Sequence, residues 1–380
     1  MSILARTLEA TDYRNFPSYT LDLDPNLTVL VGRNAVGKTN LVEALQLLTS
    51  GRSFRKPAPS DLVREGAGRC RIGLTLEGEG RVIDLGCTVE AGKRSFSRNG
   101  KRCRAVGVRG VVPSVLFCPD DLDMVKRGAK VRREALDSFG VQLNEGYAQL
   151  VGTYERALEQ RNALLKERFC TPELLETWNE SLAATGAALT VHRIALLARI
   201  RDHLLAAYGQ IAGGEAIEVS YLPSWMDEDA AAGPWLQELS AADRHEAIDE
   251  IRERIAGAFR ARADEEMRRG MTMSGPHRDE VLFTVAGRAA RTFASQGQQR
   301  SIVLAWKMAE VEVTRDILDR PPLLLLDDVM SELDAARRDA FLQCVEHDVQ
   351  TVITTTNLGY FTERVVDEAK VVSIGEEQIG

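Results

Sequence analysis

The sequence lacks the features that mark several classes of protein. Six cysteines are scattered along the chain without a C-x-x-C pair: Cys70, Cys87, Cys103, Cys118, Cys170 and Cys344. Neither a disulfide framework nor a zinc site is predicted, because both use cysteines at characteristic spacings. No apolar run approaches the roughly 20 residues of a membrane span, and residues 1–6 carry no secretory pattern. These absences predict a cytoplasmic protein with reduced thiols.

An excess of positive charge is also lacking. The chain has 48 Lys and Arg against 56 Asp and Glu, which gives a net charge of −8. A sequence-wide basic character is therefore absent, and binding to nucleic acid would need a local basic surface. The 380 residues, 44% of them hydrophobic, are enough for one large domain with an inserted lobe or for two or three units.

The chain does contain a phosphate-binding loop. Residues 32–39 read G-x-x-x-x-G-K-T directly after the apolar run Leu27 to Val31, and apolar residues at helical spacing follow. This strand–loop–helix context suits phosphate, which backbone N–H groups and the helix dipole would hold. Lys38 would reach the terminal phosphates, and the Thr39 hydroxyl would ligate Mg²⁺. The predicted nucleotide-binding residues are Gly32, Arg33, Asn34, Ala35, Val36, Gly37, Lys38, Thr39 and Asn40.

A second motif narrows the chemistry to nucleotide hydrolysis. Four leucines, residues 323–326, lead into Asp327 and Asp328, a pattern typical of a buried parallel strand that ends in carboxylates. Asp327 is predicted on the Mg²⁺ side, with Thr39 as the second metal ligand. Asp328 is predicted to orient or deprotonate the attacking water and to act with Lys38 as a catalytic residue. ATP and Mg²⁺ are the expected cofactors.

A third motif predicts a site shared by two molecules. Residues 295–298 read S-Q-G-Q and open a helix, which offers either a second anion-binding terminus or an ordinary serine cap. Since the phosphate loop is already a complete cradle, we expect the second terminus to meet the γ-phosphate held by another copy. The turn at residues 331–334 would lie along the same seam. The residues predicted there are Ser295, Gly297, Gln298, Ser331 and Asp334.

Basic residues gather between Lys93 and Arg104, around the dipeptide Asn99-Gly100. This dipeptide is a strong hairpin signal, so several cations would lie at one hairpin tip. The predicted DNA contacts are Arg98, Lys101 and Arg102, and an ordinary charged hairpin is the alternative. The basic segment at residues 51–56 is expected to be exposed, either as a solvated loop or as a contact with phosphate or a partner.

Periodicity predicts an α/β fold with an antiparallel β-subdomain and an inserted, mainly helical lobe. A mostly parallel sheet would carry the phosphate loop. The expected ranges are residues 1–115 for the first ATPase part, 116–272 for the helical lobe, and 273–380 for the second ATPase part. Within the lobe, one amphipathic helix is expected from Leu136 to Leu165, a second from Thr171-Pro172, a loop at 223–241 and a helix at about 243–269.

Together, these motifs resemble the Walker A, signature, Walker B and D-loop motifs of ABC-type ATPases. Over essentially the whole chain, further stretches are similar to the RecF family of bacterial recombination mediators: residues 51–55, 119–122, 132–133, 160–162 and 274–279, with the Asp327-Asp328 pair. The resemblance implies the fold of an ABC-type P-loop ATPase head, SMC- or Rad50-like, without a long coiled coil. It implies DNA binding, an ATP-dependent homodimer and weak DNA-stimulated ATP hydrolysis. The resemblance also implies that the protein works with RecR to load RecA at gapped DNA. The processes it implies are DNA repair, recombination, replication and the SOS response.

Two positions depart from the ABC-type pattern. Many such ATPases carry Glu where this chain has Asp328, and the shorter side chain predicts slow turnover, with ATP serving as a switch. The usual histidine after the last strand is replaced by Thr354 to Thr356, and the sequence does not identify a substitute. His277 is open between a functional contact and a structural role.

Three other functions are considered: a transporter ATPase subunit, a nuclease-coupled ATPase, and a scaffold that binds ATP without hydrolysis. The helical insertion argues against the first. The lack of an additional acidic metal cluster argues against the second. A measurement of ATP turnover would test the third, because a scaffold would not hydrolyse ATP.

Overall fold

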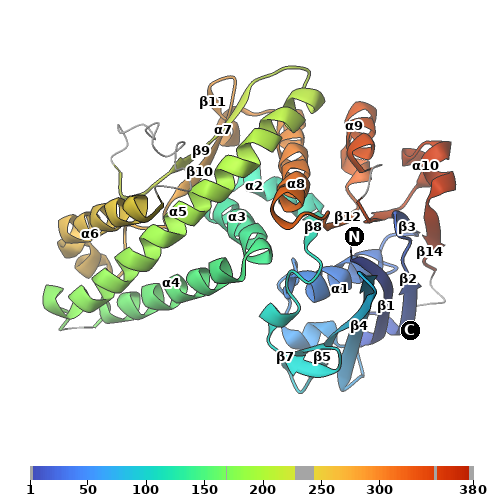
Figure 1. Cartoon of the computed structure of the whole chain (residues 1–380), viewed down its shortest axis with the longest axis horizontal. Coiled ribbons are helices and arrows are strands. Elements are labelled where there is room, and N and C mark those ends of the chain that lie inside the picture. The colour runs from blue at the N-terminus through green and yellow to red at the C-terminus, as the bar shows by residue number, and fades with distance from the viewer. Residues whose placement is uncertain (1–2, 168, 227–243, 346–348, 376–380) are drawn as a thin grey trace. The chain divides into compact units, whose positions relative to one another are not determined.

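The computed structural model of the chain describes residues 3–167, 169–226, 244–345 and 349–375 (Figure 1). It has two compact units, residues 1–121 with 304–380, and residues 122–303. The second unit therefore begins six residues later than the expected helical lobe and also includes residues 273–303. Strand pairing explains the later end, because β10 (Glu280–Val285) pairs antiparallel with β9 (Ile217–Leu222).

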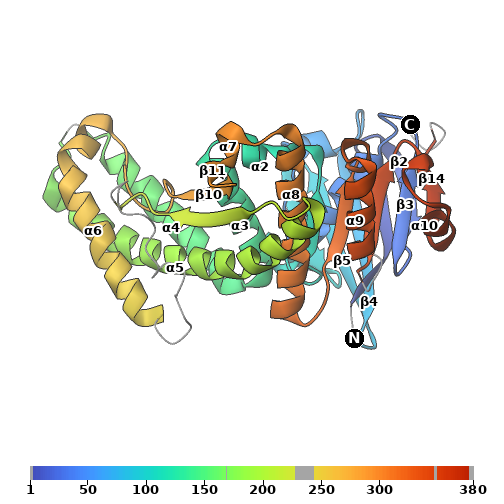
Figure 2. The same ribbon diagram turned by 90° about the horizontal axis from the view of Figure 1, so that it is seen from above.

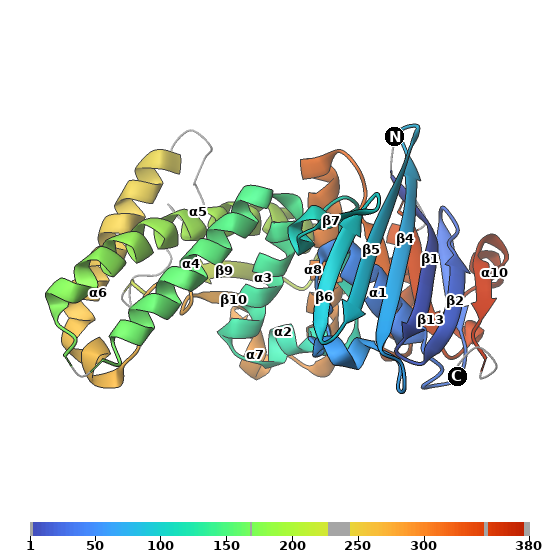
Figure 3. The ribbon, with the colours of Figure 1, turned by 90° about the horizontal axis from the view of Figure 1, so that it is seen from below.

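The first unit contains an antiparallel sheet of order β2-β1-β4-β5-β6-β7, whose strands are visible in Figure 3. Its strands are β1 (Leu4–Tyr13), β2 (Phe16–Asp22), β4 (Arg69–Gly78), β5 (Arg81–Glu90), β6 (Lys93–Arg98) and β7 (Lys101–Cys103). Buried residues alternate along β4, which puts one face of the sheet on the core. The predicted hairpin is confirmed: Asn99 and Gly100 both have positive φ, 50° and 73°, as a two-residue turn of this kind requires.

A five-stranded sheet of order β14-β3-β13-β12-β8 carries the phosphate loop, and all its pairings are parallel. Its strands are β3 (Leu27–Val31), β8 (Ser114–Phe117), β12 (Leu323–Asp327), β13 (Thr351–Thr355) and β14 (Lys370–Ser373). Figure 2 shows this part of the unit from above. Because the strands are parallel, their carboxyl ends meet at one edge, where β3, β12 and β13 place the candidate site.

Helix α1 (Lys38–Ser50) belongs to the core of the first unit and contacts strands of both sheets. Five consecutive residues, 41–45, are buried, which covers more than a full turn. Because α1 is buried on every side, the surrounding core fixes the position of its N-terminus, where the phosphate loop ends. The other helices of this unit are α9 (Ala335–Val345), α10 (Glu363–Glu368) and most of α8 (Gln296–Leu318).

The second unit combines helices with the small sheet β11-β10-β9, in which β11 spans Arg288–Ala289. Its helices are α2 (Asp123–Lys126), α3 (Ala129–Leu143), α4 (Glu145–Leu164), α5 (Pro172–Ile211), α6 (Arg244–Arg269) and α7 (Ala290–Phe293). The single helix expected from Leu136 to Leu165 is wrong. Asn144 has φ −146°, and its side chain accepts from the Tyr147 N–H at 3.1 Å, so it ends α3 and caps α4.

The remaining predictions for this unit have different outcomes. The helices at 171–172 and about 243–269 are confirmed as α5 and α6, and Thr171 caps α5. Most of the loop predicted at 223–241 lies outside the described residues. Among the described helices, α5 alone is long and apolar enough to cross a membrane, and 61% of that window is buried inside the protein.

Polar side chains are buried between the helices of the second unit. Arg161 and Glu266 are 1% and 0% exposed and pair at 2.6 Å. Arg161 also donates to Thr272 at 2.8 Å and lies over the Phe259 ring. The guanidinium therefore makes hydrogen bonds along its edges and a cation–π contact through one face. This buried pair ties α4 to α6.

Candidate nucleotide-binding site

The two glycines of the phosphate loop are required by their surroundings. A Cβ on Gly32 would lie 2.5 Å from the backbone oxygen of Ile374, which follows β14. A Cβ on Gly37 would lie 2.5 Å from the Phe16 ring, and Gly37 has φ 99°. Both positions therefore exclude a side chain, and the backbone of the loop can curl at the N-terminus of α1.

Lys38 turns back over this loop. Its Nζ donates to the carbonyl oxygens of Gly32 and Arg33 at 2.7 and 2.8 Å. The side chain is 6% exposed, and burial lowers the pKa of Lys38, against the opposing effects of Asp328 and Asp327. The ammonium group thus lies at the loop, close to two carboxylates.

Thr39 and Asp327 meet at the edge of the parallel sheet. The Thr39 hydroxyl donates to Asp327 Oδ1 at 2.9 Å, although 288 residues separate them. Burial raises the pKa of Asp327, while hydrogen bonds from Thr39 and Thr354 lower it. A hydroxyl and a carboxylate side by side are the hard oxygen donors that Mg²⁺ prefers. The two predicted metal ligands therefore lie together.

Thr354, at the end of β13, joins the two aspartates. Its buried hydroxyl donates to Asp327 Oδ1 at 2.9 Å and accepts from the Asp328 N–H at 2.9 Å. Of the three consecutive threonines, Thr355 instead donates to the Asn357 carbonyl, and Thr356 is exposed just beyond the strand. The sequence could not choose among them, because only the register of β13 against β12 selects Thr354.

Asp328 has a left-handed backbone, with φ 53°. Among residues with a side chain, Asp and Asn tolerate this region best, since a short polar side chain bonds locally. The conformation supplies a structural reason for Asp rather than a longer acid at this position.

The loop after α1, residues 51–56, contacts side chains of α1 next to the phosphate loop. Glu43 on α1 is fully buried and accepts from Arg14 at 2.9 Å and from Ser53. Arg55 donates to Asn40 at 2.8 Å and lies 3.6 Å from Glu43. The expectation that residues 51–56 are simply exposed is wrong for Ser53, which is 7% exposed because the buried carboxylate draws the loop inward.

The second unit contains the signature turn, residues 295–298. Gln298 N donates to Ser295 Oγ at 3.2 Å, and Ser295 N donates to Gln298 Oε1 at 2.7 Å. This reciprocal pair is a capping box at the start of α8. The serine cap and the anion-binding terminus, expected from the sequence as alternatives, are therefore compatible, because the hydroxyl accepts through a lone pair and keeps its proton to donate.

The D-loop turn lies in the first unit, directly after the two aspartates. Ser331 Oγ donates to the Asp328 carbonyl at 3.0 Å. Asp334 accepts from Arg337 N at 2.9 Å, so its carboxylate caps α9. Both side chains are thus tied to their own turn.

Two further groups of residues singled out in the sequence do not belong to these motifs. Arg98, Lys101 and Arg102 are exposed on the β6–β7 hairpin; Arg98 and Lys101 are paired across the strands and share a face, while Arg102 pairs with Ser97. His277 bonds to the Tyr154 hydroxyl at 2.7 Å and to the Thr272 carbonyl at 3.1 Å, and burial lowers its pKa to about 4. These contacts give His277 a structural role.

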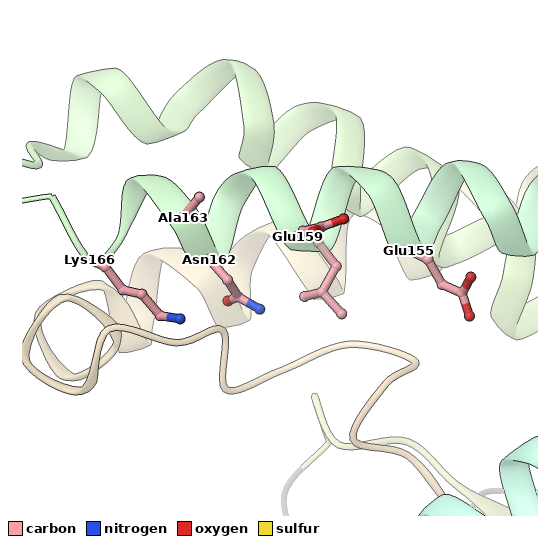
Figure 4. A pocket seen from close by; sticks show the side chains of 6 residues that line it. Glu155, Glu159, Asn162, Ala163 and Lys166 are labelled. Atoms are coloured by element: carbon pink, nitrogen blue, oxygen red, sulfur yellow. The ribbon is translucent and has the colours of Figure 1, made fainter. Parts of the chain in front are cut away.

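A groove of about 510 Å³ runs along α4 (Figure 4). It is lined by Glu155, Leu158, Glu159, Asn162, Ala163 and Lys166. The Asn162 amide oxygen already accepts from Thr272 N and Oγ1, each at 2.8 Å. None of the lining residues belongs to the phosphate loop, the Walker B strand or the signature turn.

Comparisons with known proteins agree with this arrangement. Residues 4–378 match the family model for the RecF/RecN/SMC N terminal domain. The chain is 35% identical over 384 residues to the DNA replication and repair protein RecF of Gloeobacter violaceus, covering 99% of this chain and 98% of that protein.

Solved structures give the same result. A structure of the recombination mediator protein RecF-ATP in the RecFOR pathway superposes with a TM-score of 0.84 at 27% identity, covering 95% of this chain and 94% of that chain. An SMC head bound to the C-winged helix domain of ScpA is 13% identical, with a TM-score of 0.55 over 99% of this chain and 95% of that chain, and shares the fold. The chain therefore belongs to the RecF family of DNA replication and repair proteins, within the broader family of RecF, RecN and SMC N-terminal domains.

Proposed function

We propose that this protein is a cytoplasmic, ATP-dependent DNA-binding protein in which ATP closes two copies of the chain around two nucleotides. Hydrolysis is slow, is stimulated by DNA, and reopens the pair. With RecR, the closed dimer helps to load RecA at gapped DNA during recombinational repair and replication. The observation that carries this proposal is the meeting of Thr39 and Asp327 at 2.9 Å beside Lys38, at the N-terminus of α1.

The residues present fit Mg²⁺ and a nucleoside triphosphate. The two glycines hold the loop open for phosphate, Lys38 supplies an ammonium group, and Thr39 with Asp327 supplies two hard oxygen donors. When bound, Mg²⁺ would neutralise charge on the phosphate oxygens. Asp328, held through its N–H by Thr354, accepts a proton from the attacking water.

Closure by a second copy would supply the remaining donors. The Ser295 hydroxyl and the Gly297 N–H lie at the start of α8, where the helix dipole favours an anion. The turn containing Ser331 and Asp334 would lie at the same interface. A dimer of this kind would bury each nucleotide between two chains, so that ATP acts as a switch for association.

DNA binding by an acidic protein needs a local surface. Arg98 and Lys101, which share one face of the hairpin, would form such a surface, with the exposed Arg102 beside them on the opposite face. Dimerisation would align two of these hairpins into a groove that neither copy has alone. DNA affinity should therefore require ATP and fall steeply with salt, because contacts to phosphates release counterions.

Molecular mass in solution tests the proposal. The protein should be monomeric without nucleotide or with ADP, and dimeric with ATP and Mg²⁺, by light scattering after gel filtration. Lys38→Arg should stay monomeric under all three conditions, because a guanidinium does not reproduce the compact ammonium group. An unchanged mass in ATP would contradict the proposed switch, and equal DNA affinity with and without ATP would contradict the groove.

A further inference from the structure

The signature turn is held by a carboxylate from another element of the second unit. Gln298 Oε1 accepts from Ser295 N at 2.7 Å, and Gln298 Nε2 donates to Glu215 Oε1 at 2.7 Å. Both ends of the amide are therefore engaged, and the side chain of Gln298 is fixed between two partners. Glu215 precedes Gln298 by 83 residues and lies in the connection between α5 and β9.

Glu215 is in turn fixed by the end of α5. Its Oε2 accepts from the hydroxyl of Tyr208, a fully buried residue in the last turn of the 40-residue helix, at 2.9 Å. Gly213 and Gly214, with φ 66° and 93°, bring the chain back toward the helix. One carboxylate thus bridges the C-terminal end of α5 to the start of α8.

We propose that Glu215 is a positioning residue that ties the signature turn to α5 and so sets how Ser295 is presented to a nucleotide held by another copy of the chain. The inference rests on the proposed function. Without Glu215, the Gln298 amide loses one of its two partners, and the reciprocal pair with Ser295 loosens. The effect reaches the nucleotide through Gln298 and Ser295, without contact between Glu215 and the phosphate.

The choice of a carboxylate has a physical reason. A negative charge close to an anion-binding terminus opposes phosphate, so electrostatic attraction to the ligand does not explain Glu215. An ionised acceptor does make hydrogen bonds about twice as strong as those of a neutral one. A carboxylate also offers two oxygens, which allows it to accept from Gln298 and Tyr208 at once.

Three variants of the full-length chain separate these roles. Glu215→Ala removes both hydrogen bonds, whereas Glu215→Gln keeps an acceptor oxygen. Glu218→Ala is the matched control, because Glu218 is an exposed acid three residues further on, in β9. Dimerisation is measured by sedimentation against ATP concentration. Binding to the phosphate loop is measured separately, with a fluorescent ATP analogue at protein concentrations that keep the chain monomeric.

We expect Glu215→Ala to weaken ATP-dependent dimerisation about tenfold, equivalent to about 1.4 kcal/mol. Glu215→Gln should fall between Glu215→Ala and the parent, and Glu218→Ala should match the parent. Nucleotide affinity of the monomer should stay within about twofold in all variants, because the phosphate loop is untouched. In Glu215→Ala, amide hydrogen exchange at residues 294–300 should be faster even without nucleotide.

Different results overturn different statements. If Glu215→Ala dimerised as well as the parent, this inference would be refuted and the proposed function would stand. Equal losses of dimerisation and monomer nucleotide affinity would also refute it, because they indicate a general structural role. A parent that stays monomeric in ATP would refute the proposed function and this inference together. Unchanged hydrogen exchange in Glu215→Ala would show that Glu215 does not hold the signature turn, and would refute this inference.

Discussion

The hydroxyl of Thr354 should be needed both for the stability of the site and for turnover. Thr354→Val keeps the shape of the side chain but removes the donor to Asp327 and the acceptor for the Asp328 N–H. Thr354→Ser keeps both bonds and loses one buried methyl group. The pair of variants therefore separates the hydroxyl from the packing around it.

The expected size of the effect follows from the two bonds. A hydrogen bond to a charged group contributes about 1.5–3 kcal/mol and a neutral one about 1 kcal/mol, so Thr354→Val should cost about 2–4 kcal/mol in the first unit. Thr354→Ser should cost about 1 kcal/mol, the value of a buried methyl group. Because Asp327 and Asp328 both lose orientation, we also expect ATP turnover by Thr354→Val to fall about 10–100-fold.

Local measurements are needed because the chain has two compact units. Hydrogen exchange of the β12 and β13 peptides at increasing urea reports the first unit by itself. Turnover at saturating ATP reports the aspartates, while affinity for nucleotide without Mg²⁺ reports the phosphate loop and should change little. If Thr354→Val matched the parent in exchange and turnover, or if Thr354→Ser were as damaged as Thr354→Val, the assigned role of the hydroxyl would be wrong.

Three further predictions concern other parts of the chain. Arg161→Met leaves Glu266 buried without its cation and should cost about 3–5 kcal/mol by urea denaturation, whereas adding Glu266→Gln should restore more than half of that loss; a double variant as unstable as the single one would contradict this. His277 has a folded pKa of about 4 against about 6.5 unfolded, so the unfolded chain takes up the proton first as pH falls. The contribution of His277 to the free energy of unfolding, about 3 kcal/mol at most, is present in full above pH 6.5 and is lost progressively toward pH 4. The stability of a His277→Gln variant should therefore decline less steeply as pH falls. An identical slope would argue against the lowered pKa of His277. Lys101→Glu should weaken ATP-dependent DNA binding and reduce its salt slope by about 1–2, measured by fluorescence anisotropy, whereas unchanged affinity would remove the hairpin from the DNA surface.

The phosphate loop and its surroundings were predictable because their signals are local. The sequence of β3, the loop and α1 specifies strand, turn and helix within about two dozen residues. Four leucines before Asp327 indicate a buried parallel strand, and Asn99-Gly100 indicates a hairpin. In each case, neighbouring residues alone determine the conformation, so the structure agrees with the sequence.

Other features depend on distant partners. Apolar spacing continues through Asn144, so periodicity did not reveal that this residue ends α3 and caps α4. Glu43 lies among apolar neighbours on α1, and a buried acid requires a cation; that signal predicts a partner such as Arg14, but it does not identify Ser53 as the second residue that turns toward this carboxylate. The contact of Glu215 with Gln298 had no local signal, because 83 residues separate the two side chains.

The order of strands in the parallel sheet has a consequence for synthesis of the chain. β3 lies between β13 and β14, and both of these strands are translated far later than β3. At about 5–20 residues per second, β3 waits roughly 15–60 s before either neighbour exists. During that interval its backbone N–H and C=O groups face whatever else can pair with them, so a nascent chain should need a chaperone more than the finished protein does. The phosphate loop therefore acquires its final shape only after Ile374 has been translated and has closed against Gly32.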